Sequence, residues 1–328
     1  MSHTPLFSED LGEAESDEQL DALQLKFPKY DRGYICQSTG KTCKKTREWL
    51  EGLWHQYAPH ADRNFLTEFR TSFPQRAWEL YLGATALNRG YSLGENKGAG
   101  ADLDLLDKDG KRVAWVEAIS VLKGTGADAV TEMNYHGAVV DVPTEAMSLR
   151  ITQALKDKHD QYLRRLGKTV KEGEPYIVAI DRSAFGHIEH IPLGLRVVYG
   201  IGNPVLRIPI PVEGRTEPRD WSKAESAYQR QEVIAKKNGV QITSMFFLDP
   251  AHAGISAIIY SSAGILNMPR QPNQLGESLL IAHNPLARNP LIGKFSFGEE
   301  WMGDENGAWK IKENQEHEKP DPFDYLYD

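Results

Sequence analysis

The chain has 328 residues, of which 40% are hydrophobic and 26% are charged, the composition of an ordinary globular protein. No apolar run approaches the roughly 18 residues that a membrane span requires, and the acidic N-terminus lacks the Lys and Arg of a signal or transit peptide. Collagen, coiled coils, disulfide-rich scaffolds and membrane proteins are thereby excluded. Two cysteines fit a reducing cytoplasm, where we expect the protein.

Charge is unevenly distributed along the chain. Residues 1–22 hold seven acids and no Lys or Arg, and residues 313–328 hold six acids and one Lys. The body between them has 33 acids and 37 bases, a net charge near +4. Like-charged ends are usually solvated, so we predict an acidic disordered tail over 1–22 and an acidic C-terminal tail over 301–328. The basic body permits a nucleic-acid partner, with which the acidic tails would compete for the surface of the body.

A helical segment is predicted over residues 23–72. Its main helix covers Thr46–Tyr57, where apolar residues recur on one face. A short acid-free stretch at the start of this helix offers cations to nucleic-acid phosphates, namely Lys41, Lys44, Lys45 and Arg47. A second helix is predicted from Pro74, a favoured first-turn residue, to Asn88, shortly before Gly90.

Residues 73–300 are predicted to form one α/β domain with a mixed central sheet flanked by helices. Strands over Ala101–Leu106 and Val113–Val121 enclose a tight-turn sequence and form a hairpin. A long amphipathic helix follows over Thr144–Leu166, and an inserted Pro-rich loop spans 201–222. Further elements are one polar helix over Lys223–Asn238 and strands over Tyr176–Ile180, Leu195–Tyr199, Met245–Leu248, Gly254–Tyr260 and Leu279–His283.

Carboxylates gather on the second helix and on the hairpin. Glu79 lies in an otherwise apolar helix, where a buried carboxylate must be paired or reach solvent. Asp102 and Asp104 are two residues apart on one strand and share a face, and Asp104 is taken as solvated. Glu117 lies mid-strand among apolar neighbours, opposite the first strand of the hairpin. Oxygen ligands gathered in this way suit Mg²⁺ or Mn²⁺, which can activate water and neutralise a phosphodiester.

Glu79, the turn Gly98–Asp102 and the strand Val116–Ile119 together resemble the PD-(D/E)xK nuclease superfamily. In that superfamily a helix acid, a strand Asp after a Gly-rich turn and an acid-x-Lys on the next strand form the metal site. The resemblance covers about 50 residues and rests on a short motif. It implies a restriction-endonuclease-like fold, Mg²⁺ or Mn²⁺ bound by Glu79, Asp102 and Glu117, and hydrolysis of phosphodiester bonds in DNA. Many nucleases of this fold pair to cut both strands, so a homodimer is compatible with the resemblance.

Ile119 occupies the position of the motif Lys, which would position the attacking water and stabilise the charge of the transition state. Either a lysine from elsewhere replaces it, with Lys97, Lys123 and Lys156 as candidates, or the site no longer cuts. We include Lys123 with the three acids in the candidate catalytic set. A catalytically inactive nuclease-fold binding module is the alternative.

Two further motifs compete with this interpretation. Gly124–Ala129 follows a strand and fits G-x-G-x-x-A, with Asp141 as a ribose-binding acid, which makes a dinucleotide-dependent enzyme the second alternative. The helix that should follow these glycines would be too short to pack on a sheet, so we interpret Gly124–Ala129 as a turn. The other motif has the Cys-Cys-His-His order of a zinc site and comprises Cys36, Cys43, His55 and His60. The spacing between its two cysteines is longer than in the usual site.

Overall fold

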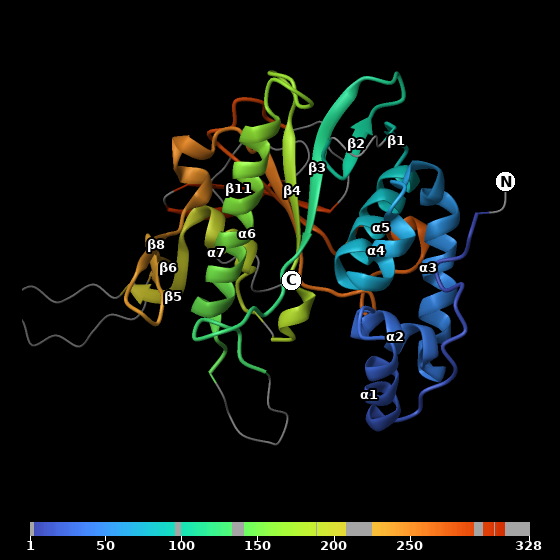
Figure 1. The fold of residues 1–328 in the computed structure, drawn as a ribbon. Coiled ribbons are helices and arrows are strands. Elements are labelled where there is room, and N and C mark those ends of the chain that lie inside the picture. The colour runs from blue at the N-terminus through green and yellow to red at the C-terminus, as the bar shows by residue number, and fades with distance from the viewer. Residues whose placement is uncertain are drawn as a thin grey trace, which may run out of the picture.

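The computed structural model describes residues 3–95, 100–132, 141–187, 189–207, 225–291, 298–304 and 306–311. Within these residues the chain is an α/β protein in which helices cover both faces of a mixed sheet (Figure 1). The expected fold class is confirmed at this level. No helix in the described part of the chain combines the length and apolar character that crossing a bilayer requires.

The main sheet contains eight of the described strands in the order β1-β2-β3-β4-β9-β10-β11-β12. β3 pairs in parallel with β4, and β4 with β9, whereas β2 pairs antiparallel with both β1 and β3. β10 pairs antiparallel with β9 and parallel with β11, and β12 closes the edge antiparallel to β11. The strands are β1 (Ser92–Leu93), β2 (Leu103–Leu106), β3 (Arg112–Ser120), β4 (Tyr176–Asp181), β9 (Ala257–Ser261), β10 (Leu280–His283), β11 (Glu299–Asp304) and β12 (Gly307–Lys310).

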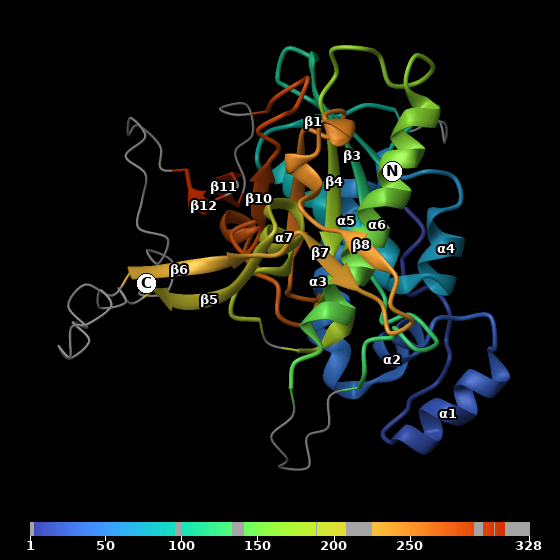
Figure 2. The same cartoon turned by 90° about the vertical axis from the view of Figure 1, so that its left-hand side faces the viewer.

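Helices α3, α4 and α5 lie on one face of the sheet, and α6 and α7 lie on the other (Figure 1). The two-stranded ribbon β5–β6 projects from the α7 side, as Figure 2 shows. The helices are α1 (Asp17–Lys26), α2 (Arg32–Thr39), α3 (Lys44–Tyr57), α4 (Phe65–Thr71), α5 (Phe73–Asn88), α6 (Thr144–Arg165) and α7 (Leu193–Tyr199). The ribbons are β5 (Ile201–Arg207) with β6 (Glu225–Arg230), and β7 (Val233–Ala235) with β8 (Gln241–Thr243). Short 3-10 turns lie at Lys41–Cys43, Ala58–His60, Ser183–Phe185, Phe246–Leu248, Pro250–His252 and Pro272–Gln274.

The sheet separates two hydrophobic cores, because successive side chains of a strand point to opposite faces. On one face α5 is buried on nearly every side, and its Trp78 indole N–H donates to the Ala179 carbonyl of β4 at 3.0 Å. On the other face α6 and α7 pack over Val178 and Ile180. β3 and β4 are therefore covered on both sides, which is why they contain long apolar runs.

The strongest periodic signals in the sequence predicted their elements well. The helix expected over Thr46–Tyr57 is α3, the one from Pro74 is α5, and the one over Thr144–Leu166 is α6. The predicted hairpin is confirmed, with Leu103 opposite Val116 in an antiparallel pair. Three of the five further strands are present as β4, β9 and β10.

Three predicted elements were wrong. Leu195–Tyr199, expected as a strand, belongs to helix α7, because a short apolar run between Pro192 and the left-handed Gly200 fits a buried helix as well as a strand. Met245–Leu248 is largely a 3-10 turn. The helix expected over Lys223–Asn238 is replaced by β6 and β7, which gain partners in β5 and β8 that a local pattern cannot reveal. The Pro-rich loop begins as strand β5, and residues 208–224 lie outside the described part of the chain.

The described part of the N-terminal segment is ordered, contrary to the disordered tail expected over 1–22. Leu6 is fully buried, the N–H groups of Leu6 and Phe7 donate to the Glu51 carboxylate at 3.2 and 3.0 Å, and the Trp54 indole donates to Thr4 O at 2.9 Å. A few apolar anchors thus outweigh the acidic composition. The boundary at residue 301 is also wrong, since β11 and β12 extend the sheet to Lys310, and residues 312–328 lie outside the described range.

We expect Gly83→Ala in α5 to destabilise the fold, because the new Cβ would stand 2.4 Å from two ring carbons of Tyr57. Overpacking of this kind typically costs about 1–3 kcal/mol and would lower Tm. Gly52→Ala in α3 is the matched control, since nothing lies within 4 Å of its Cβ. The control should be neutral or more stable by up to about 1 kcal/mol, the helix propensity difference. Equal melting temperatures for the two variants would contradict this packing.

Candidate functional site

The hairpin β2–β3 places Asp102 beside Glu117. Asp102 directly precedes β2, and its Oδ2 accepts a hydrogen bond from the backbone N–H of Ala118 on β3 at 2.8 Å. Because Leu103 stands opposite Val116, the next position in the antiparallel register sets Asp102 against Glu117. The adjacency that the sequence predicted for these two acids is confirmed.

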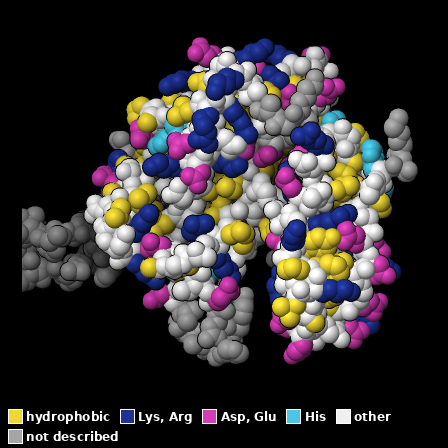
Figure 3. All heavy atoms as spheres, viewed as in Figure 1, with side chains coloured by type: hydrophobic (Ala, Val, Ile, Leu, Met, Phe, Trp, Pro, Cys, Tyr) yellow, Lys and Arg dark blue, Asp and Glu magenta, His cyan; other side chains and the backbone are white. Residues whose placement is uncertain are grey.

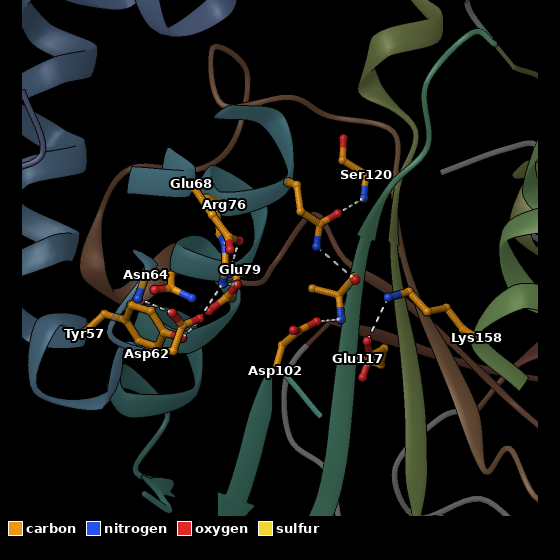
Figure 4. A network of polar contacts seen from close by, with 12 residues as sticks. Tyr57, Asp62, Asn64, Glu68, Arg76, Glu79, Asp102, Glu117, Ser120 and Lys158 are labelled. Atoms are coloured by element: carbon orange, nitrogen blue, oxygen red, sulfur yellow. Dashed lines mark hydrogen bonds and ion pairs between the residues drawn. The ribbon is translucent and has the colours of Figure 1, made fainter. Parts of the chain in front are cut away.

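Glu117 is 2% exposed and lies on the α6 face of the sheet, where two cations of α6 reach it. Lys158 Nζ lies 2.7 Å from Oε1, and Arg165 pairs with Oε2 (Figure 4 shows Lys158 and Glu117). The Tyr176 hydroxyl also donates to Oε2 at 3.1 Å. A buried carboxylate needs partners of this quality, since removing one from a buried pair leaves an uncompensated charge.

Glu79 belongs to a different network on the opposite side of the sheet. It is fully buried, accepts from the Tyr57 hydroxyl at 2.7 Å and pairs with Arg76 at 2.5 Å. Arg76 also pairs with Asp62 at 2.9 Å and with Glu68 (Figure 4). Burial raises the pKa of Glu79 to about 7, although Arg76 and Tyr57 act to lower it. Glu79 therefore couples α5 to α3 and to the turn before α4.

Asp102 is the carboxylate at which the two networks meet. Its pKa is raised well above the usual range, first by burial, then by the charge of Glu117 and then by that of Glu79. Lys158 and the Ala118 N–H act in the opposite direction. The charges of Glu117 and Glu79 thus favour the protonated form of Asp102, and Lys158 opposes them.

The expected metal site of Glu79, Asp102 and Glu117 is not assembled as one group. Among the described residues no cluster of three or more His, Cys, Asp or Glu side chains could hold a metal ion. Glu79 does not fit, because α5 packs on the face opposite Glu117 and Arg76 and Tyr57 hold its oxygens. Asp102 and Glu117 do fit in kind, because Mg²⁺ often binds one or two carboxylates while waters and phosphates complete its shell.

The lysine beside Glu117 is none of the three predicted ones. Lys97 lies outside the described residues, Lys123 pairs with Glu132, and Lys156 is exposed on α6. Lys158 was missed because a lysine on a long helix is ordinarily a solvated residue. The helical spacing could have indicated its position. Lys158 lies three residues after Leu155 and four before Tyr162, both buried, and therefore on the face of α6 that packs on the sheet.

The basic stretch at the start of α3 is partly occupied by contacts within the protein. Lys41 pairs with Glu15 and lies 3.4 Å from Glu13 of the acidic N-terminal segment, although its side chain is 59% exposed. Lys44 lies 3.9 Å from Glu48. Arg47 donates to two backbone carbonyls at the end of α2, and Lys45 is exposed. The exposed ion pairs are weak, so these contacts lower but do not abolish the availability of Lys41 and Lys44.

The dinucleotide alternative requires a helix directly after Gly124–Ala129, and the described residues do not form one there. Residues 121–132 after β3 form turns without a helix, and the next described helix, α6, begins at Thr144. A pyrophosphate site of that kind needs a helix N-terminus directly after the glycines. Asp141 follows the undescribed residues 133–140.

The zinc alternative also lacks its geometry. Cys36 and Cys43 are free thiols close to one another, and burial and this neighbour raise the pKa of Cys36. His60 instead contacts the backbone of Leu93, and His55 is exposed on α3. These four residues, all of them described, do not form a metal-binding group.

A separate cavity of about 420 Å³ opens at the carboxyl ends of β4 and β9, where ligands commonly bind in parallel sheets. Trp78, Asp181, Arg182 and Gln37 are among the residues that line it. Asp181 accepts from the Ser120 hydroxyl at 2.9 Å and the Ser183 N–H at 2.8 Å, and Arg182 donates to Tyr260 and the His187 carbonyl. Its charged groups are thus engaged within the protein, and the acids of the predicted site do not line it.

Comparison of the chain with protein-family models, curated proteins and solved structures gives no match.

We expect Glu79→Gln to change how stability depends on pH. A carboxyl whose folded pKa is raised above its unfolded value stabilises the fold at low pH, and that contribution is lost as pH rises from about 4.5 towards about 7. Gln cannot ionise, so the variant should gain stability relative to the natural chain between pH 5 and pH 8, by on the order of 1–3 kcal/mol. Thermal unfolding at several pH values measures this. Glu68→Gln, at a more exposed partner of the same Arg76, is the control. A stability difference between Glu79→Gln and the natural chain that does not vary with pH would contradict the raised pKa of Glu79.

Proposed function

We propose that this protein is a divalent-metal-dependent nuclease of restriction-endonuclease-like fold that hydrolyses phosphodiester bonds in DNA. The observation that carries the proposal is Lys158 Nζ at 2.7 Å from Glu117 Oε1, with Asp102 on the adjacent strand. This arrangement supplies two acids and a lysine at one point although Ile119 occupies the motif position. The helix acid, strand Asp and next-strand acid also occur on α5, before β2 and on β3, in the order that the resemblance requires.

In this proposal Asp102 and Glu117 hold Mg²⁺ or Mn²⁺, and Lys158 has the role of the missing lysine. When bound, the ion supplies water activation and neutralisation of phosphodiester charge. Lys158 orients the attacking water and stabilises charge that develops on the phosphorus oxygens. Glu79 acts as a positioning residue, because its pair with Arg76 fixes α5 against α3 and α4 while its charge acts on Asp102.

Substrate access requires the two cations of α6 to change partners. Glu117 is 2% exposed, whereas the side chains of Lys158 and Arg165 are 17% and 20% exposed. Both long side chains can turn towards a phosphate, which competes with Glu117 for them through charge-assisted hydrogen bonds. Their departure would leave Glu117 free to bind the metal ion.

The C-terminal end of α6 offers a surface for the nucleic acid. Residues 158–171 contain five Lys and Arg and one Asp, and Arg164, Lys168 and Lys171 are exposed. Figure 3 shows Lys and Arg side chains gathered over the upper part of this face, where α6 ends. Phosphate contacts of this kind bind without sequence discrimination. We therefore propose this surface, in addition to the stretch Lys41–Arg47, as the nucleic-acid interface.

A catalytically inactive binding module on the same fold is the second candidate. It is favoured by the saturation of Glu117, whose two oxygens already engage Lys158, Arg165 and Tyr176. In that case the acids and cations of β3 and α6 stabilise the fold, and only the basic surface contacts a partner.

The decisive assay is cleavage of plasmid and single-stranded DNA with Mg²⁺ or Mn²⁺. We expect the natural chain to cut, and Asp102→Asn, Glu117→Gln and Lys158→Met to lower the rate at least a hundredfold, the scale of losing one charged group at a reacting centre. Glutamine replaces Glu117 because its amide keeps the shape of the side chain and one acceptor oxygen for Lys158 and Arg165, whereas alanine would remove the acceptor as well as the charge. Lys156→Met, an exposed lysine two residues away, is the matched control and should cut normally.

The outcomes separate the two candidates. Cleavage that survives Glu117→Gln and Lys158→Met would reject the assigned site and point to a contaminant. No cleavage by any variant, with DNA binding retained, would favour the inactive module.

Charge reversal tests the proposed surface independently of cleavage. We expect Arg164→Glu with Lys168→Glu to weaken DNA binding more than tenfold in low salt and to reduce the slope of log Kd against log salt by about 2, one for each lost phosphate contact. The double variant Lys44→Glu with Lys45→Glu changes the net charge by the same amount at the start of α3, in the predicted basic stretch. A larger effect from the second pair would reverse the assignment. Fluorescence anisotropy with labelled DNA measures both.

A further inference from the structure

A small cavity lies where the N-terminal end of α6 approaches α7, away from Glu117. Its volume is about 160 Å³, and its lining includes Thr144, Met147, His190, Leu193, Arg196 and Asn203. Cavities that accept drug-sized ligands measure roughly 300–1,000 Å³, so this one is suited to a small group and not to a whole nucleotide.

Arg196 brings a buried positive charge into this cavity. Its side chain is 9% exposed, because α7 is buried on all sides. Nη2 donates to Asn203 Oδ1 at 3.1 Å and approaches Gln231 Oε1 at 3.4 Å, both neutral amide oxygens, and Nε is buried without a hydrogen-bond partner. Burial lowers the pKa of this guanidinium. A buried cation with neutral partners is costly, and an anion beside it would relieve that cost.

The acid that lines the cavity, Glu189, does not compensate Arg196. Glu189 Oε1 lies 3.1 Å from Arg182, and its Oε2 accepts from the Leu193 N–H at 2.9 Å and the Tyr260 hydroxyl at 2.7 Å. Its charge is therefore balanced by Arg182. Glu145, in the first turn of α6, is exposed and favours the charged form of Arg196 from a distance.

The start of α6 adds a second attraction for an anion at the same place. The helix has 22 residues, and its N-cap is Pro143, which has no side-chain hydrogen bond to the first turn. The N-terminus of a helix presents N–H groups and the positive end of the helix dipole. Thr144, its first residue, lines the cavity together with Arg196, and because its own N–H donates to the Val142 carbonyl at 2.7 Å, the attraction at this end is that of the helix dipole.

We propose that this cavity binds one phosphate group through Arg196, Asn203 and the N-terminus of α6. The group is either free orthophosphate or the terminal phosphate of a nucleic-acid strand, since the cavity accommodates a single oxyanion and the guanidinium provides the donors that phosphate prefers. This inference does not depend on the proposed nuclease activity.

The test is thermal unfolding and titration calorimetry with inorganic phosphate, without divalent metal, against chloride at equal ionic strength. We expect phosphate to raise the Tm of the natural chain by on the order of 3–5 °C when it exceeds its Kd a hundredfold. Arg196→Met should abolish the response. It should also fold at least as well without phosphate, because it removes an unpaired buried charge. Arg32→Met, at an exposed arginine of α2, should respond like the natural chain.

Arg196→Lys provides a second variant, which keeps the charge and should bind phosphate about tenfold more weakly through loss of the forked geometry. An unchanged response in Arg196→Met, or no response of the natural chain at tens of millimolar phosphate, would overturn the proposal. Competition with a short 5′-phosphorylated oligonucleotide and its 5′-hydroxyl counterpart identifies the source. Arg196-dependent preference for the phosphorylated strand assigns a strand end, and equal weak competition with retained phosphate binding assigns orthophosphate.

Discussion

The neutralisation of buried carboxylates is the constraint on which the arrangement of this protein depends. β3 is covered on both faces, so Glu117 cannot reach water and must find cations inside the fold. Lys158 and Arg165 provide them from positions seven residues apart on one face of α6. If α6 shifted along the sheet or rotated, Glu117 would lose its partners and remain as a buried charge. The ion pairs with Lys158 and Arg165 therefore fix the position and the rotation of α6 on the sheet.

The same requirement is met by different residues on the other face of the sheet. There Glu79 is satisfied by Arg76 and Tyr57, which ties α5 to α3. Asp102 stands between the two networks and is influenced by both acids. Residues that resemble a nuclease motif thus also hold the two layers of the fold together. Structure and proposed chemistry compete for the same carboxylates, and a substrate phosphate would shift that balance by attracting the cations of α6.

Helix α6 links the proposed catalytic site and the proposed phosphate cavity because positively charged side chains lie at both of its ends. Its C-terminal end and the following turn concentrate exposed Lys and Arg beside Glu117. Its N-terminal end meets the guanidinium of Arg196, whose Nε has no hydrogen-bond partner. Both ends therefore attract phosphate, one through exposed side chains and the other through a buried charge.

The sequence by itself determined the elements with strong local periodicity: α3, α5, α6 and the hairpin that sets Asp102 against Glu117. Their apolar spacing and turn residues specify local structure without help from distant parts of the chain. Only the tertiary structure decided which cation faces Glu117, because the choice of Lys158 over Lys156 depends on how α6 rotates against the sheet. It also separated Glu79 from the other acids, since the alternation of side chains along β3 puts Glu117 on the face opposite α5. The ribbons β5–β8, helix α7 and the ordered N-terminal segment likewise depend on partners far away in sequence, which no local pattern of residues encodes.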